Sequence, residues 1–335
     1  MKKKYILIFL LVFVLLLSAC GSVPPMETQG GSTPPTDPAS DNTAYTDFAI
    51  VSVGTFDYRV GSCCYRKITL SVGGQEITGM ALYSRMYEVE ELIIPDQVGG
   101  LPVIAIGTAP EYAQEMPFYN DKTLKRVVIP ETVCLIGVRS FANCTELTDL
   151  ALPSGIKCIG SWAFENCPGL KEITITADMK LYTFSLSGAV GLQKVTIQDG
   201  VTELHSFHGC KNLTELTLPS SMEKLGLFGS DGNEPSFYGT SITFLEIPEG
   251  VTYLGWYLFE GAPLESIILP STLEKTGDRA FNCDTLKAVY FRGTEEQFME
   301  NLYDEITVPI YFLSGTQPTQ EGNYWHYVDG KPVIW

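Results

Sequence analysis

The amino-acid sequence predicts a β-rich α/β solenoid of about nine rungs, each of roughly 22–23 residues, with short β caps at both ends. The first observation behind this prediction is a leucine or isoleucine that recurs at a nearly constant interval. The second is a run of apolar residues on alternate positions after it, which is the period of a half-buried strand. The recurring positions are Leu124, Leu147, Leu170, Leu192, Leu213, Ile242, Leu264 and Leu286, in steps of 23, 23, 22, 21, 29, 22 and 22 residues, after a divergent first unit from Val89.

Each unit follows the same order, which the unit starting at Leu147 illustrates. Leu150 and Leu152 form the alternating apolar pair of a strand, and a proline ends the strand in most units. Ile156 and the pair Ile159-Gly160 mark a turn back across the body, and an aromatic residue with small neighbours closes the coil. One unit cannot bury its own apolar side, whereas a stack of units buries a continuous column. The prolines are Pro130, Pro153, Pro219, Pro248 and Pro270.

The repeated motif L-x-x-(I/L)-x-(I/L)-P, followed by (I/L)-G-x-x-A-F-x-x-C, resembles the BspA-type leucine-rich repeat. The resemblance covers residues 89–298, and the units from Leu170 and Ile242 depart from the pattern at a few positions. It implies a leucine-rich repeat solenoid belonging to a bacterial cell-surface, adhesin-like family. Insertions at 107–123 and 226–239 interrupt the period and are expected to emerge as loops.

Residues 1–19 have the pattern of an export signal. Three lysines at positions 2–4 precede a charge-free apolar run, 5–17. That run is shorter than the ~20 residues of a membrane-spanning helix and suits a signal peptide. The segment ends in Leu-Ser-Ala-Cys20, which resembles the signal motif of bacterial lipoproteins. The resemblance implies that Cys20 becomes the lipid-anchored N-terminus; the alternative is a cleaved secretory signal with an incidental cysteine.

The segment after the signal is expected to be a tether. Residues 20–47 contain the lipidated cysteine and a stretch rich in Pro, Gly, Ser and Thr, which has too little apolar surface to offset the entropy of ordering. Removal of the signal leaves 19 basic and 39 acidic side chains, a net charge of −20. Such an acidic protein is not expected to bind nucleic acid or an anionic membrane surface directly.

Both ends of the solenoid are predicted to carry β caps, because an open end would expose the core. Residues 48–88 contain alternating apolar stretches that suggest a short β element over the first rung. The repeats extend over 89–298. Residues 299–335 form the predicted C-terminal cap, in which Asp329-Gly330 between apolar flanks is a hairpin signal.

A small residue recurs three positions before the next leucine, and cysteine is its most frequent occupant. A metal site needs ligating atoms, which alanine and glycine do not supply, whereas a packed column needs only limited volume. The favoured interpretation is therefore a ladder of small core residues, with disulfides between rungs as the alternative. No pairing can be read for Cys63, Cys64, Cys134 and Cys158. The ladder positions are Cys144, Cys167, Ala189, Cys210, Gly239, Gly261 and Cys283.

The sequence contains none of the common catalytic, phosphate-binding or dinucleotide motifs, so an enzyme is not predicted. Numerous carboxylates are scattered over the rungs and single out no catalytic pair. His205, His208 and Cys210 superficially resemble zinc spacing, but Cys210 occupies an ordinary repeat position. No catalytic, cofactor-binding or metal-ligating residues are therefore predicted, and no cofactor.

A ligand surface is predicted on the outward positions of the strands, which form two parallel files. The expected ligand-contacting residues are Phe244, Ile268, Tyr290, Arg126 and Lys194; the alternative is that the C-terminal cap covers the apolar ones. The first file is Ile93, Val128, Ala151, Thr174, Thr196, Thr217, Glu246, Ile268 and Tyr290. The second file is Glu91, Arg126, Asp149, Glu172, Lys194, Glu215, Phe244, Ser266 and Ala288.

These observations together favour a monomeric, extracytoplasmic protein attached to the cell membrane through lipid on Cys20. Its expected role is non-catalytic binding of proteins or glycans on host or neighbouring cells. The alternative hypothesis is a structural scaffold of the envelope without an external ligand. An exported hydrolase is the weakest hypothesis, because no catalytic constellation is present.

Overall fold

The computed structural model describes residues 48–109, 115–204, 207–226, 235–301, 306–319 and 322–335. The signal segment, Cys20 and the tether lie outside these ranges, as do 110–114 and 227–234 of the two insertions. Among the described residues, no helix is both long and apolar enough to cross a membrane. Residues 43–335 belong to one compact unit.

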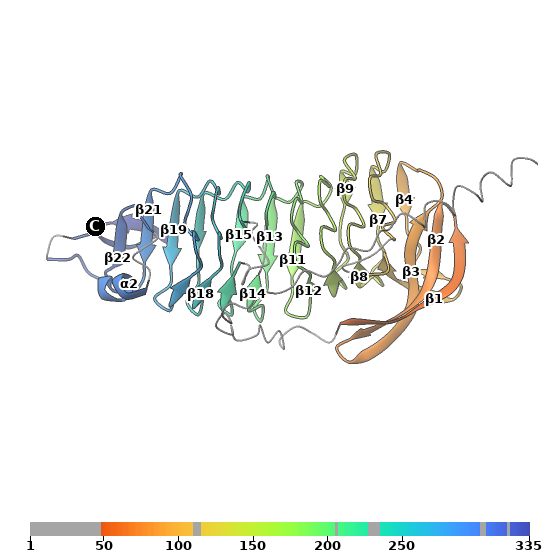
Figure 1. The fold of residues 1–335 in the computed structure, drawn as a ribbon, viewed down its shortest axis with the longest axis horizontal. Helices are drawn as coiled ribbons and strands as arrows, with labels where there is room; N and C mark the ends of the chain where they lie inside the picture. The colour runs from red at the N-terminus through yellow and green to blue at the C-terminus, as the bar shows by residue number, and fades with distance from the viewer. Residues whose placement is uncertain (1–47, 110–114, 205–206, 227–234, 302–305, 320–321) are drawn as a thin grey trace, which may run out of the picture. The chain divides into compact units, whose positions relative to one another are not determined.

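The body is a solenoid in which each rung contributes one strand to a parallel stack (Figure 1). The predicted β-rich repeat fold is confirmed, and a further parallel strand, β22 (Ile310–Leu313), brings the stack to about ten turns. The outward side of the stacked strands is called the strand face below. Its strands are β4 (Glu91–Ile93), β7 (Arg126–Val128), β9 (Asp149–Leu150), β11 (Glu172–Ile175), β13 (Lys194–Ile197), β15 (Glu215–Thr217), β17 (Phe244–Glu246), β19 (Ser266–Leu269) and β21 (Ala288–Phe291).

A second series of short parallel strands forms where each rung turns back. Backbone N–H groups of one rung donate to carbonyls of the rung before it, for example from Gly160 to Ile136 at 2.8 Å. A small antiparallel strand, β5 (Gln97–Val98), pairs with the first member. The second series comprises β6 (Leu101–Ile106), β8 (Leu135–Ile136), β10 (Cys158–Ile159), β12 (Lys180–Leu181), β14 (Glu203–Leu204), β16 (Lys224–Leu225), β18 (Tyr253–Leu254) and β20 (Lys275–Thr276).

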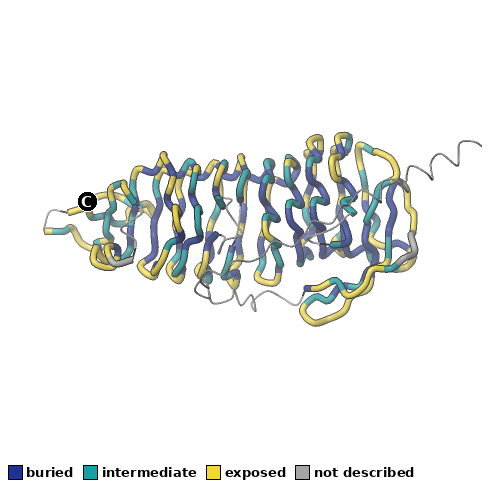
Figure 2. Tube along the Cα trace, viewed as in Figure 1, coloured by how far each residue is buried: buried dark blue, intermediate teal, exposed yellow. Residues whose placement is uncertain are grey.

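A column of aromatic rings fills the core between the two series, and Figure 2 shows buried backbone in every rung. Adjacent rings lie 5.1–5.9 Å apart between centroids, in the range of favourable aromatic pairs. Leu186 replaces the ring in one rung, as the sequence indicated. The column consists of Phe118, Phe141, Phe164, Leu186, Phe207, Phe237, Phe259 and Phe281.

A column of small residues runs beside the aromatic column, and cysteine occupies several of its positions. Cys144, Cys167 and Cys210 are fully buried, and all eight described cysteines are free. The Cys144 thiol donates to the Phe118 carbonyl of the preceding rung at 3.0 Å. Burial raises the pKa of the Cys144 and Cys210 thiols to about 12, so both are neutral at physiological pH.

The prediction that Gly239 and Gly261 belong to the small column is wrong by one residue in each rung. The N–H of each residue in the small column donates to the carbonyl of the ring-column residue two or three positions before it. In these two rungs the donors are Thr240 and Ala262. The interval to the next leucine or isoleucine is two residues there rather than three, so counting back from that residue missed the position. The glycines instead adopt positive φ values, 68° and 64°.

The first turn places a carboxylate in the small column. Asp121 lies three residues after Phe118 and forms an ion pair with Arg85, with side-chain exposures of 2% and 8%. Its other oxygen accepts hydrogen bonds from the N–H groups of Thr123 and Leu124 at 2.9 and 3.0 Å. The column therefore ends in a buried ion pair. Removing one partner would be strongly destabilising, because it would leave the other charge buried and uncompensated.

The N-terminal cap is an antiparallel sheet of β1 (Ala49–Val60), β2 (Cys63–Val72) and β3 (Gln75–Arg85). Strand β3 pairs in parallel with β6, so the cap continues the second series. The register of β1 shifts twice, which is typical of a strand that bends. Ile68 and Leu70 pack in a separate core. That core buries Cys134, Leu135 and Cys158 of the second series.

The C-terminal cap extends the strand face. The helix α2 (Glu295–Asn301) follows β21, and β22 then pairs with β23 (Tyr324–Val328), which forms an antiparallel hairpin with β24 (Lys331–Ile334). The hairpin turn contains Asp329 and Gly330 at φ values of 50° and 74°. Two residues at positive φ match the turn type that Asp-Gly favours.

Cys167→Ala is expected to change the free energy of unfolding by about 1 kcal/mol or less, since alanine already fills the same position at Ala189. Cys167→Leu is expected to cost about 1–3 kcal/mol because it overpacks the column. Urea unfolding of both variants measures the difference. A cost of several kcal/mol for Cys167→Ala would instead indicate a bridge or a bound metal.

Candidate functional site

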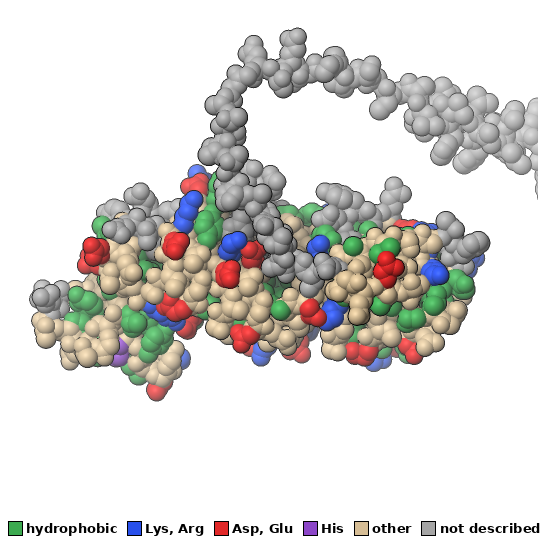
Figure 3. Space-filling view, turned by 90° about the horizontal axis from the view of Figure 1, so that it is seen from below, with side chains coloured by type: hydrophobic (Ala, Val, Ile, Leu, Met, Phe, Trp, Pro, Cys, Tyr) green, Lys and Arg blue, Asp and Glu red, His purple; other side chains and the backbone are tan. Residues whose placement is uncertain are grey.

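The strand face presents the alternation that its sequence predicts. In β11 the outward Glu172 and Thr174 are exposed, while Ile173 and Ile175 are buried. Parallel register places equivalent residues of neighbouring rungs side by side, as with Thr174 and Thr196. The two files of outward residues therefore lie next to each other along the solenoid. In Figure 3, which shows the solenoid from another side, acidic and basic side chains are interspersed.

The predicted basic residues of this face are engaged in ion pairs between rungs. Arg126 lies 2.9 Å from Asp149, and Lys194 lies 3.4 Å from Glu215. Both cations are about half exposed, so each pair contributes ~0–1 kcal/mol to stability. Arg126 and Lys194 belong to rungs far apart in the stack and do not form one basic cluster.

The predicted apolar cluster does not form on the surface. Phe244 is 43% exposed, as expected, but Ile268 is fully buried and Tyr290 is half-buried. Ile268 keeps the outward register of Glu246 and Tyr290, but the prediction that it is exposed is wrong. The C-terminal cap contacts both of these neighbours, through Tyr327 at Glu246 and Trp325 at Tyr290. Tyr290 stacks on Tyr311 with centroids 5.6 Å apart and meets the edge of Trp325.

Arg292 fastens the cap over this part of the strand face. Its Nη1 donates to the Ile247 carbonyl at 3.0 Å, and its Nε donates to the Tyr327 hydroxyl at 3.0 Å. Its Nη2 forms an ion pair with Glu246. The guanidinium thus joins β17 to the hairpin strand β23. Burial raises the pKa of Tyr327, so its hydroxyl stays protonated at neutral pH.

Two grooves open on the strand face where the parallel ladder is interrupted. The strands form separate sheets, with breaks between β9 and β11 and between β15 and β17. The groove at the first break has a volume of about 570 Å³ and a rim that includes Ser154, Thr174 and Gln198. The groove at the second break has a volume of about 530 Å³. Both volumes lie in the range of ligand-binding clefts.

The groove between β15 and β17 contains the predicted residue Phe244. Glu215, Thr217 and Glu246 line the same groove, and the ion pair with Lys194 extends from it. The groove thus combines an exposed aromatic ring with carboxylate and hydroxyl groups. Its position follows the longest step of the repeat, 29 residues, which separates the two rungs in sequence.

Sequence reasoning missed the apolar end of the face near the N-terminal cap. Ile93 is 72% exposed and pairs in register with Val128, which is 37% exposed. Both residues belong to the first file of outward positions, so the sequence already contained this apolar pair. The file alone does not show which of its apolar residues a distant cap covers, so it could not separate this exposed pair from Ile268 and Tyr290.

The sequence predicted no metal-ligating and no catalytic residues. Among the described residues, no group of three or more His, Cys, Asp or Glu side chains could hold a metal ion. Cys210 is fully buried, and its thiol donates to the Leu186 carbonyl at 2.9 Å. The His208 ring stacks on Tyr238 with centroids 5.2 Å apart. His205 lies outside the described residues.

The strands, columns and caps define a leucine-rich repeat solenoid. The chain belongs to the BspA type leucine rich repeat family, whose repeats match residues 112–228 and 232–311 in six copies. No curated protein matches the chain. The chain resembles the structure of a leucine rich cell surface protein from Faecalibacterium prausnitzii A2-165, with a TM-score of 0.51 and 21% sequence identity. The match covers 78% of this chain and 74% of that chain. A leucine-rich repeat protein from Bacteroides ovatus ATCC 8483 also matches, with 20% identity, coverage of 77% and 76%, and a TM-score of 0.39.

Arg292→Ala is expected to loosen the C-terminal cap. The substitution removes hydrogen bonds to Tyr327 and Ile247 and is expected to cost about 2 kcal/mol. Hydrogen exchange should increase in β22, β23 and β24, and chemical unfolding measures the loss of stability.

Lys287→Ala provides the matched control for this prediction. Lys287 forms one exposed ion pair with Glu265, so its removal is expected to cost at most ~1 kcal/mol and to leave the hairpin protected. Equal effects of the two variants, or unchanged exchange in the hairpin of Arg292→Ala, would contradict the role assigned to Arg292.

Proposed function

We propose that this protein is a lipid-anchored, extracytoplasmic leucine-rich repeat module that binds a protein or glycan without catalysing a reaction. Membership of the BspA type repeat family supports a binding role, since solenoids present extended surfaces for partners. The similarity to a cell surface protein concerns the fold only. The proposed location therefore rests on the export signal and the cysteine at position 20.

The observation that carries the binding proposal is the groove between β15 and β17. Phe244 remains 43% exposed there, whereas Ile268 is buried and Tyr290 packs against Tyr311 and Trp325 of the C-terminal cap. Exposed aromatic residues are frequent anchors of binding surfaces because they bury much area at low entropic cost. Carboxylate and hydroxyl groups around the ring supply hydrogen-bond partners for a peptide or a sugar.

Binding by residues 43–335 to arrays of host proteins, glycans and envelope extracts tests the proposal. Phe244→Ala is expected to weaken the affinity for a saturable ligand at least ~10-fold, equivalent to ~1.4 kcal/mol. Ile93→Ala is the control, because Ile93 is exposed in the first file at the opposite end of the face.

The same experiment separates the two functional hypotheses. Saturable binding to an external protein or glycan that Phe244→Ala weakens supports the binding module. Binding only to envelope fractions favours the scaffold. Equal losses in Phe244→Ala and Ile93→Ala would remove the groove from the proposal.

Lipid attachment has a separate test. Cys20→Ser removes the thiol that would carry the lipid. The variant is expected either to appear in the medium or to retain its uncleaved signal, as fractionation and mass spectrometry of the mature N-terminus would show. A variant that remains cleaved and membrane-bound would contradict anchoring through this residue.

A further inference from the structure

A column of glycines in the second series allows the rungs to approach closely. The N–H of each column member donates to a carbonyl of the rung before it. A Cβ on Gly137 would lie 3.2 Å from the Gly107 Cα, and one on Gly277 would lie 2.5 Å from the backbone nitrogen of Trp256. Larger residues would push these rungs apart. The glycines are Gly107, Gly137, Gly160, Gly226, Gly255 and Gly277.

Two consecutive rungs lack this glycine. Tyr182 occupies the position in one rung, with its N–H donating to the Ile159 carbonyl at 3.0 Å. In the next rung the sequence has His205 after Leu204, where a later rung has Gly226 after Leu225; His205 itself lies outside the described residues. The second series is interrupted at the same place, since β12 ends one sheet and β14 begins another. The strand-face partners β11 and β13 remain paired, so the two rungs separate on one side only.

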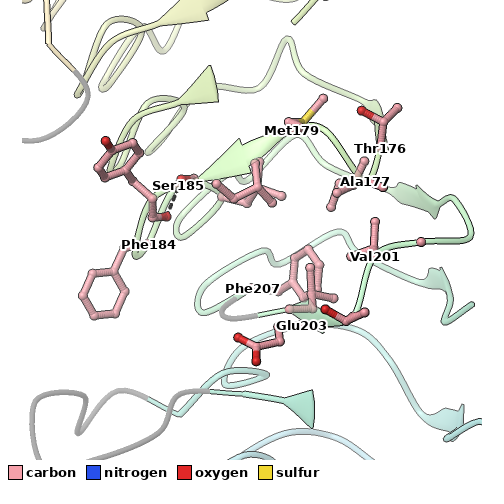
Figure 4. A pocket seen from close by; sticks show the side chains of 15 residues that line it. Thr176, Ala177, Met179, Phe184, Ser185, Val201, Glu203 and Phe207 are labelled. Atoms are coloured by element: carbon pink, nitrogen blue, oxygen red, sulfur yellow. Dashed lines mark hydrogen bonds between the residues drawn. The ribbon is translucent and has the colours of Figure 1, made fainter. Parts of the chain in front are cut away.

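A partly enclosed cavity of about 80 Å³ lies between these two rungs (Figure 4). Figure 4 shows Met179 and Ala177 on one side and Val201 and Phe207 on the other, while Phe184 points away. Met179, Val201 and Phe207 are buried, as are Ile175, Leu186 and Leu204. Leu181 and Phe184 are half-buried and Ala177 is exposed, so the lining is open to solvent on that side.

Polar groups near the cavity are directed to other partners. The Ser185 hydroxyl donates to the Ile159 carbonyl at 2.8 Å, and the Thr176 hydroxyl donates to Asp178 at 2.6 Å. Glu203 forms an ion pair with Lys224 at 2.9 Å. Apolar cavities without polar groups to satisfy remain dry and accept small apolar molecules. An empty cavity also lowers stability in proportion to its volume.

We propose that this cavity is a binding site for a small, uncharged molecule that inserts a short alkyl group. The volume is several times that of one water, and about half that of an apolar cavity known to bind benzene, ~150 Å³. An alkyl group of two or three carbons fits this space, whereas the larger aromatic ring does not. The site lies on the second series, apart from the strand-face groove, and does not depend on the proposed function.

Methyl NMR of residues 43–335 with labelled methionine tests the proposal, using xenon and ethane as probes. The Met179 methyl is expected to shift saturably with both probes, and benzene is expected to have no effect. Met80 is the internal control, because it is fully buried in β3 of the N-terminal cap. No saturable shift of Met179, or equal shifts of Met179 and Met80, would overturn the proposal.

Val201→Leu fills the cavity and is expected to abolish the Met179 response while raising Tm. Val251→Leu is the matched control. Val251 occupies the equivalent position of a rung that keeps its glycine, so the same substitution overpacks it, lowers Tm and preserves the response. A Val201→Leu protein that still shows the saturable shift overturns the proposal.

Val201→Ala provides a second variant if the leucine variant does not fold. The wider cavity is expected to retain xenon binding and to admit benzene, each as a saturable shift of Met179. Failure of both probes to produce that shift in folded Val201→Ala would likewise overturn the proposal.

Discussion

Close stacking of successive rungs is the constraint on which the rest of the structure depends. Each rung donates backbone hydrogen bonds to the one before it, so residues at equivalent positions form columns with nearly fixed spacing. A column accepts only side chains that fit this spacing. The result is a ring column, a small-residue column and a glycine column, each repeated through the core. Cysteine serves here as a small apolar residue with a thiol that can donate to a carbonyl.

Departures from the columns create the surface features of the protein. In the part of the chain that the structure describes, the parallel ladder is interrupted in three places, two on the strand face and one on the second series, and each is accompanied by a groove or cavity. The cavity coincides with Tyr182 in the glycine column. The groove at Phe244 follows the longest interval of the repeat. These three interruptions are thus places where another molecule can bind.

The sequence alone was sufficient for features that depend on local spacing. Alternation within each strand predicted which residues face outward, and Asp329-Gly330 predicted the C-terminal hairpin. It was insufficient where segments distant in the chain meet. Ile268 has the pattern of an exposed residue but is buried where its neighbours Glu246 and Tyr290 contact the C-terminal cap. Gly239 and Gly261 were misassigned because the rung is one residue shorter there, which only the hydrogen bonds of Thr240 and Ala262 reveal.

The ion pair between Arg85 and Asp121 has a consequence for how the length of this protein can change. Asp121 makes the first turn unlike the others, because its carboxylate requires the arginine of the N-terminal cap. Arg292 likewise joins the last rungs to the C-terminal hairpin. Gene duplication or deletion could therefore add or remove whole rungs between these two ends without breaking the buried Arg85–Asp121 pair. Each end rung is matched to its own cap, so rungs can be gained or lost only between the two ends.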